Sequence, residues 1–202
     1  CSTGSSALYL ARQAVRGGLA DLALAFGFEK MEKGSLGMKY TDRTPAMDHH
    51  LQKLMESHEL TAAPMAPQMF GDAGVDHMKQ YGSTPEHFAW IGWKNHKHSV
   101  NNPYAQFQDE YSLEDILNAP MISPPLTKLQ CSPTSDGAGA ALVASERYVD
   151  EHDLWDRAIE IAGQSMVTDT PATFAEGATA IEVVGFDMSK QARIRAMEEA
   201  QI

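Results

Sequence analysis

Hydrophobic residues at the start of the chain recur first at helical and then at strand-like spacing. Residues 5–16 carry the apolar face of a helix, formed by Ala7, Leu8, Ala11, Ala14 and Val15. Serine and threonine residues ahead of this face can cap a helix, and Gly17–Gly18 can end it. The near-continuous apolar run LALAFGFEKM begins at Leu22 and is typical of a strand covered on both faces. The pattern therefore predicts a helix, a short turn and a buried strand of an α/β sheet.

The periodicity weakens between residues 34 and 125, where glycine, proline, methionine and polar residues are mixed. So long a stretch inside a compact protein usually forms small helices of its own and covers a site. Two parts of it are more regular. The segment from Pro85 to Asn102–Pro103, preceded by a Ser-Thr pair that can cap it, predicts a helix, and SLEDIL after Ser112 predicts a shorter one. We expect a loop domain over about residues 34–125.

The last third of the chain returns to short regular segments. CSPTSDGAGAALVASE predicts a Gly/Ser turn followed by a strand of small residues that runs through Val143. Residues 159–162 are a further strand candidate, and SKQARIRAMEEA after Ser189 predicts a helix. Helices alternating with buried strands place the chain in the α/β class.

Composition excludes several classes of function. A net charge of −11 over 202 residues argues against nucleic acid as a main partner, although one basic pocket would still bind an anionic ligand. The two cysteines, Cys1 and Cys131, are too few for a disulfide framework and favour a reducing compartment. No apolar run approaches the ~20 residues that span a bilayer, and the start of the chain lacks a signal-peptide pattern.

Cys1 stands directly before the first predicted helix, among small residues. Unpaired N–H groups and the positive end of the dipole at a helix N-terminus stabilise a thiolate, and such N–H groups can also bind the oxyanion of a thioester under attack. The segment CSTGSSAL therefore suits a cysteine nucleophile that carries an acyl group. The alternative from the residues alone is a small, buried, structural thiol.

At this point the sequence resembles the thiolases, and in particular the sterol carrier protein X type. The resemblance is carried by CSTGSSAL before a helix and LALAFGFEKM, and by APMAPQMFGDAG, IGWKNHKHSVNNPYAQFQDEYSLEDIL, CSPTSDGAGAALVASE and VVGFDMSK. It covers essentially the whole chain. It implies a layered αβαβα thiolase fold, present here as most of the first half over residues 1–150, with the loop domain inserted, and the beginning of the second half over residues 151–202.

The resemblance also implies an activity and its setting. Thiolases of this type cleave a 3-oxoacyl-CoA with CoA as co-substrate, through an acyl-cysteine intermediate, in fatty-acid β-oxidation and lipid metabolism. The implied partners are acyl-CoA, CoA and a second copy in a homodimer, with no permanently bound cofactor or metal. The implied location is the peroxisome, or the cytoplasm of a bacterium.

Several residues match positions that the family uses. Cys1 matches the nucleophile, and its backbone N–H would form part of an oxyanion hole. Met69, Phe70 and Gly71 match the stretch that borders the acyl pocket. Ser132, Asp136 and Gly137 match a Ser and an Asp-Gly turn before the last strand of the first half.

The sequence also departs from the family. The family's catalytic histidine lies in a Gly-His-Pro motif and its second cysteine in a Cys-x-Gly motif, and neither motif is present here. Cys131 lies in CSPTSDG, so it is not assigned the acid/base role. We therefore expect an internal fragment of a longer enzyme that is inactive by itself. The alternatives are a hydrolase with Cys1 as an N-terminal nucleophile and a degenerate thiolase that only binds acyl-CoA.

Histidine pairs suggest a further function. Adjacent His49 and His50 diverge, and His96 and His98, two apart on a helix, do not share a face, so a metal site is disfavoured. His96 and His98, with Lys97 between them, could instead lie near the phosphates of CoA. A solvated helix end is the alternative.

Overall fold

The computed structural model describes residues 2–34, 37 and 40–202, and it divides into two compact units. The first unit combines the segment up to residue 33 with residues 134–168 and 188–202. The second unit combines residues 34–133 and 169–187. Helices and strands are mixed along the chain, which confirms the predicted α/β class.

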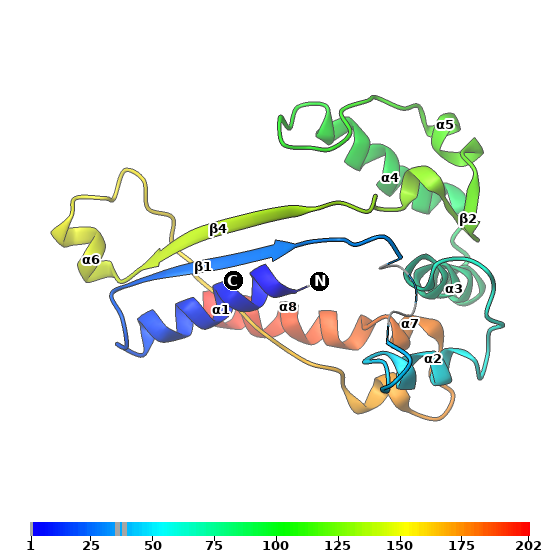
Figure 1. Cartoon of the computed structure of the whole chain (residues 1–202), viewed down its shortest axis with the longest axis horizontal. Coiled ribbons are helices and arrows are strands. Elements are labelled where there is room, and N and C mark those ends of the chain that lie inside the picture. The colour runs from blue at the N-terminus through cyan, green and yellow to red at the C-terminus, as the bar shows by residue number, and fades with distance from the viewer. Residues whose placement is uncertain (1, 35–36, 38–39) are drawn as a thin grey trace. The chain divides into compact units, whose positions relative to one another are not determined.

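A helix against a two-stranded antiparallel sheet forms the centre of the first unit (Figure 1). Helix α1 (Thr3–Arg16) packs on β1 (Leu22–Glu29), and β1 pairs with β4 (Gly137–Ala144) in a register that sets Leu22 opposite Ala144. The buried residues between helix and sheet are small: Ala11, Ala25 and Val143. The predicted helix, turn and strand are confirmed, as is the strand of small residues that ends near Val143.

The prediction that β1 is covered on both faces is wrong for the described residues. Ala25 and Gly27 are buried, whereas Leu24, Phe26 and Phe28 are each at least half exposed. Alternate strand residues point to opposite faces, so the alanine and glycine side of β1 meets α1 and the larger side chains lie on the open face. A continuous apolar run does not show which of its two faces is covered.

The rest of the first unit contains α6 (Glu146–Glu151), residues 188–200 of α8 (Phe186–Ala200), and an extended segment that contacts α8. The strand predicted at residues 159–162 is wrong. The backbone there bonds to side chains instead: Arg12 Nη2 donates to the carbonyl of Ile161 over 3.2 Å, and the N–H of Gln164 donates to Glu199 over 2.9 Å. Gly163 lies so close to α8 that a Cβ would stand 2.1 Å from the Ala196 carbonyl oxygen.

Helices build most of the second unit, with one small antiparallel hairpin. Its elements are α2 (Asp48–Leu54), α3 (Met65–Tyr81), α4 (Pro85–Ser99), α5 (Leu113–Asn118), β2 (Met121–Ser123), β3 (Leu126–Thr127), the 3-10 helices η1 (Lys128–Gln130) and η2 (Pro171–Phe174), and α7 (Ala180–Val183). Its core joins α2, α3 and α7 through Leu54, Met69, Ala73, Ala180, Ile181 and Val183.

The helices predicted after Thr84 and Ser112 are confirmed as α4 and α5. Thr84 and His87 form a reciprocal cap at the start of α4, and Ser112 and Asp115 do the same for α5. The 17-residue α3 is longer than the small helices expected from the weak periodicity. Its glycines lower the helical propensity, and the neighbouring elements compensate by packing against them.

The predicted insertion over residues 34–125 falls in the second unit, which extends to residue 133 and gains residues 169–187. Its role as a cover for Cys1 stays a prediction. No helix in the described part of the chain is long and apolar enough to cross a membrane.

Candidate active site

The start of α1 rests directly on β1 because two glycines face each other there. A Cβ added to Gly27 would lie 2.5 Å from Gly4 Cα and 2.6 Å from Gly4 N, distances that side-chain carbons do not adopt. A Cβ added to Gly4 would lie 4.0 Å from Gly27 Cα, which is ordinary contact. The strand side of this contact is therefore closed to any side chain, and the first turn of α1 is fixed against β1.

Among the described residues, no side chain caps the first turn of α1. Ser2 stands at the N-cap without a hydrogen bond from its side chain to a helix N–H group, while its carbonyl accepts from the N–H of Ser6 over 2.8 Å. The early N–H groups of a helix have no partner within the helix, and together with the dipole they favour an anion. Cys1, the proposed nucleophile, precedes this turn and lies outside the described residues.

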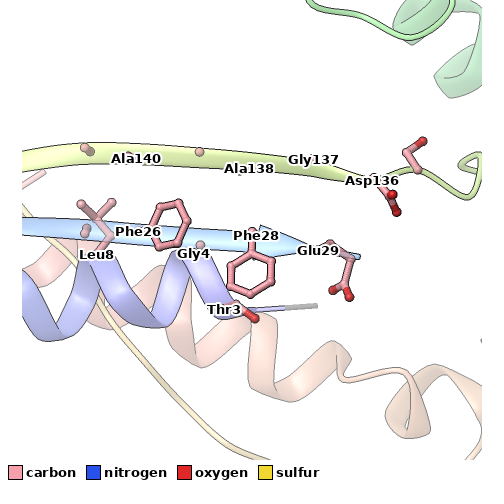
Figure 2. Close-up of a pocket in the computed structure, with 15 residues that line it drawn as sticks. Thr3, Gly4, Leu8, Phe26, Phe28, Glu29, Asp136, Gly137, Ala138 and Ala140 are labelled. Atoms are coloured by element: carbon pink, nitrogen blue, oxygen red, sulfur yellow. The ribbon is translucent and has the colours of Figure 1, made fainter. Parts of the chain in front are cut away.

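A hollow of about 520 Å³ opens beside the start of α1, within the first unit (Figure 2). Thr3, Gly4 and Leu8 of α1 border it on one side, and residues 25–29 of β1 and 135–141 before and along β4 border it on the others. Most of the β4 residues that line it are glycine or alanine, so the backbone forms much of the wall.

Asp136 closes the end of this hollow and joins β1 to β4. Its carboxylate accepts from Met31 N over 2.6 Å and from Lys30 Nζ over 3.0 Å. The N–H of Met31 and the ammonium of Lys30 lower the pKa of Asp136 below its ordinary value. The carboxylate therefore ties the residue before β4 to the residues that follow β1.

A second cavity, of about 460 Å³, lies in the second unit between α4 and the segment after η1. It brings together two of the predicted site residues, His96 and Ser132, and places Cys131 beside them. His96 Nε2 lies 2.8 Å from the Leu129 carbonyl oxygen and its ring packs edge-on against Tyr111, so its orientation is fixed. Burial raises the pKa of the Cys131 thiol, which keeps it protonated at neutral pH.

The other predicted site residues of the second unit do not line this cavity. Met69 is buried in the core of the unit, and Phe70, its neighbour on α3, is more than half exposed. Gly71 packs on the turn after β2, where a Cβ would stand 2.8 Å from the Pro124 carbonyl oxygen and 2.9 Å from Ser123 Oγ. The structure therefore gives Met69 and Gly71 packing roles, and their contact with an acyl chain stays a prediction.

His98 is exposed near the end of α4, apart from the cavity lining. In the other histidine pair, both rings pack edge-on against Phe174, and His50 Nε2 lies 3.1 Å from Asp169 Oδ2. Among the described residues, no group of three or more His, Cys, Asp or Glu side chains is arranged to hold a metal ion.

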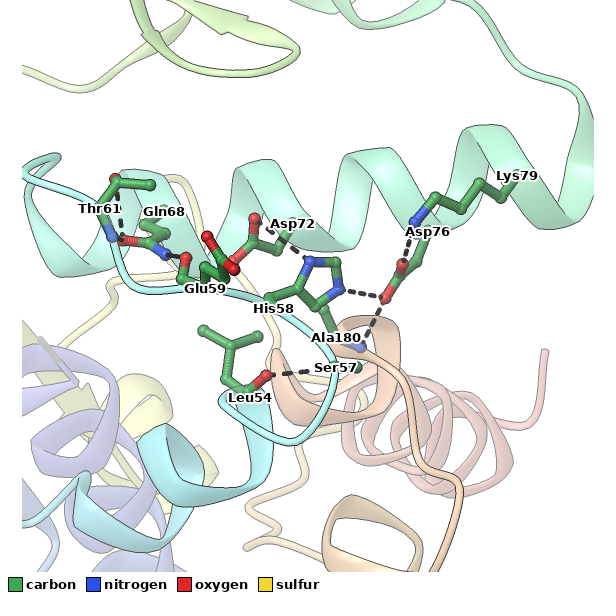
Figure 3. Close-up of polar contacts among 10 residues, drawn as sticks. All are labelled: Leu54, Ser57, His58, Glu59, Thr61, Gln68, Asp72, Asp76, Lys79 and Ala180. Atoms are coloured by element: carbon green, nitrogen blue, oxygen red, sulfur yellow. Dashed lines mark hydrogen bonds and ion pairs between the residues drawn. The ribbon is translucent and has the colours of Figure 1, made fainter.

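Sequence reasoning missed a largely buried polar cluster in the second unit (Figure 3). His58 Nε2 lies 3.0 Å from Asp76 Oδ2, and His58 Nδ1 lies 3.6 Å from Asp72 Oδ1. The same Asp76 oxygen accepts from the N–H of Ala180 over 2.9 Å. The spacing of the two aspartates, one helical turn apart, was the available signal, but it does not identify the histidine that lies between them.

The chain matches a known protein family over most of its length. A family model described as "Thiolase, N-terminal domain" matches residues 1–147. The match begins at Cys1 and covers α1, β1 and β4, which form the first hollow.

Curated relatives match nearly the whole chain. "Sterol carrier protein 2" of Rattus norvegicus is 56% identical over 200 residues, which is 99% of this chain and 36% of that protein. "Non-specific lipid-transfer protein-like 2" of Caenorhabditis elegans is 44% identical over 93% of this chain and 46% of its own length. "Benzoylsuccinyl-CoA thiolase subunit BbsB" of Thauera aromatica is 34% identical over 85% of this chain and 41% of its own. The chain thus spans between about a third and a half of the length of these relatives.

A solved structure shares the fold. The "Ltp2-ChsH2(DUF35) aldolase" superposes with a TM-score of 0.56 and 25% sequence identity, over 74% of this chain and 37% of that chain.

Proposed function

The chain belongs to the thiolase family, as its sequence motifs predicted, and we propose that it supplies the nucleophile-bearing part of an enzyme that cleaves 3-oxoacyl-CoA with CoA. The observation that carries the proposal is the uncapped first turn of α1, held against β1 directly after Cys1. An acyltransferase family and a lipid-related set of relatives agree with this reaction.

In the proposed reaction, the thiolate of Cys1 attacks the 3-oxo carbon of the substrate. The bond between C2 and C3 breaks, its electron pair stays on C2 of the departing CoA thioester, and a proton is added there. The acyl group remains on sulfur as a thioester. The thiol of CoA then attacks this thioester, gives its proton to an enzyme base, and releases a shortened acyl-CoA and free Cys1.

The described residues would support this chemistry by their positions and by the electrostatic effect of the N-terminus of α1. The positive end of α1 favours the thiolate form of a cysteine that precedes it. The N–H of Cys1 would contribute to an oxyanion hole. The histidine that activates the thiol and the acid that protonates C2 are proposed to lie in the rest of the protein, because the family's two motifs for them are absent from this sequence.

We place the CoA moiety at the second cavity, with His96 and Ser132 on its wall and His98 at the nearby end of α4. Lys97 near the end of α4 would bring positive charge to the CoA phosphates, although the chain as a whole is acidic. Met69, Phe70 and Gly71 are proposed to approach the acyl chain from α3.

The remaining proposals concern the whole protein. Residues 1–150 would be the first thiolase half and residues 151–202 the start of the second. The enzyme would act as a homodimer in the β-oxidation of fatty acids, in the peroxisome or in a bacterial cytoplasm.

The sterol carrier names of the relatives favour a second candidate function, which is binding and transfer of lipid or acyl-CoA without turnover.

The test compares variants of the two cysteines in the full-length protein. Cleavage of acetoacetyl-CoA is followed with and without CoA in the wild type, in Cys1→Ala and in the matched control Cys131→Ala. The proposal predicts CoA-dependent cleavage that Cys1→Ala abolishes; Cys131→Ala, on the wall of the proposed CoA cavity, changes KM for CoA but retains turnover. Cleavage that does not need CoA would favour the aldolase chemistry named for the solved neighbour, and binding without cleavage would favour a carrier.

A further inference from the structure

We propose that Gly27, near the C-terminal end of β1, is a positioning residue for the nucleophile, because its missing side chain determines where the first turn of α1 lies. The inference rests on the proposed function, in which Cys1 attacks the substrate. Cys1 is joined through Ser2 to Thr3 and Gly4, so the position of this turn sets the position at which the cysteine enters the site.

The contact is asymmetric, which identifies the residue that controls it. A methyl group on Gly27 would lie 2.5 Å from the backbone of Gly4, and 3.3 Å from the carbonyl carbon of Thr3. A methyl group on Gly4 meets β1 at 4.0 Å. Backbone atoms cannot rotate away as a flexible side chain can, so a substitution at Gly27 must move the helix or the strand.

The rest of α1 is anchored, so the displacement would concentrate at its first turn. Ala11 is buried against the sheet, and Arg12 Nη1 donates to both carboxylate oxygens of Glu199 over 3.1 Å. On the strand side, β1 is paired with β4 along its length. Relief of the contact to an ordinary distance needs a shift of about 1 Å, a misplacement that can cost about 10²-fold in rate.

The experiment uses the full-length protein with Gly27→Ala and, as the matched control, Gly4→Ala. The measurements are kcat and KM for acetoacetyl-CoA cleavage and the pH profile of Cys1 alkylation by iodoacetamide, read by peptide mass spectrometry. We expect Gly27→Ala to lower kcat by tenfold or more with KM changed less than threefold, and to move the alkylation profile to higher pH. We expect Gly4→Ala to lower kcat by at most threefold.

The outcomes separate this inference from the proposed function. A wild-type enzyme whose Cys1 does not react would refute the nucleophile itself. A reactive wild-type Cys1 with equal kcat and equal alkylation profiles in Gly27→Ala and Gly4→Ala would overturn the positioning role alone. If Gly27→Ala does not fold, Gly4→Val presses on the same contact from the exposed helix side, and wild-type kcat in that variant would likewise overturn the inference.

Discussion

Replacement of Asp76 by Asn should loosen the second unit far more than the same replacement of Asp72, one helical turn away. The side chains of His58, Asp72 and Asp76 are 11%, 15% and 12% exposed, so this cluster is largely shielded from water. Asp76 accepts from the N–H of Ala180 and lies within hydrogen-bond distance of His58, and these contacts join α3 to α7 and to the segment after α2. Asp72 has the longer contact to His58 and a weaker interaction with the Gln68 side chain, and neither joins it to α7.

The pKa values of the two carboxylates shift in opposite directions. Burial raises the pKa of Asp72 above its ordinary value, and the charge of His58 offsets this only in part. Burial also acts on Asp76, but the hydrogen bonds from His58 and from the Ala180 N–H outweigh it and lower the pKa. Asp76 therefore stabilises the fold above the ordinary aspartate pKa, and this contribution is lost as the pH falls through its lower folded-state pKa. Asp72 opposes the fold as the pH rises through its raised pKa.

The size of the effect follows from the charge lost. A hydrogen bond to a charged group contributes about 1.5–3 kcal/mol and a neutral one about 0.5–1.5 kcal/mol, and the Asn oxygen can still accept from both donors of Asp76 Oδ2, but without the charge. With two bonds weakened in this way, we expect Asp76→Asn to lower the free energy of local opening by about 2–3 kcal/mol at pH 7. Asp72→Asn removes a buried charge together with one long contact, so we expect a change within about 1 kcal/mol.

Hydrogen exchange measured by mass spectrometry on the full-length protein reports this opening. Peptides that contain the Ala180 amide should exchange faster in Asp76→Asn, with little change in Asp72→Asn, and the difference from wild type should shrink below about pH 4. Equal acceleration in both variants, or an unchanged Ala180 amide in Asp76→Asn, would refute the reasoning.

Three further perturbations follow from the described contacts. Hydrogen bonds from Arg12 and from the Gln164 N–H lower the pKa of Glu199 to about 2, so the contribution of Glu199 to stability is complete above pH 4.5 and disappears as the pH falls toward 2. Glu199→Gln should therefore speed hydrogen exchange at residues 161–164 at pH 7. Unchanged exchange at these residues would contradict this. Gly71→Ala should lower the melting temperature, measured by scanning calorimetry, because its Cβ would meet the Pro124 carbonyl oxygen at 2.8 Å, whereas Gly139→Ala, with open space around its Cβ, should not. Cys131 should resist alkylation below pH 9 because burial raises its pKa, and fast labelling at pH 7 would be inconsistent with its place in the structure.

The local elements were predictable where the sequence pattern matches the packing. The apolar spacing of residues 5–16 and the caps at Thr84 and Ser112 depend on neighbours in sequence, so α1, α4 and α5 were found. Helix α3 was underestimated because its glycines pack on the turn after β2, a contact that periodicity does not reveal. The strand at residues 159–162 was wrong because distant side chains, Arg12 and Glu199, bond that backbone.

In the candidate site too, some features could be predicted from the sequence and others only from the structure. Its chemistry could be inferred from one residue type, a cysteine ahead of a helix among small residues. The contact of Gly27 with Gly4 joins positions far apart in sequence, and a single glycine does not indicate which backbone approaches it. The roles of Met69 and Gly71 could not be decided from sequence either, since core packing and an acyl pocket both favour small or apolar residues.

The central claim is that Cys1 carries the acyl group, and trapping that intermediate tests it most directly. The full-length protein is mixed with acetoacetyl-CoA in the absence of free CoA, quenched in acid, digested, and mapped by mass spectrometry. We predict an acetyl group on the peptide that contains Cys1, which disappears when CoA is added and does not form in Cys1→Ala. An acetyl group found on Cys131 instead, or cleavage that proceeds with Cys1 unmodified, would contradict the account.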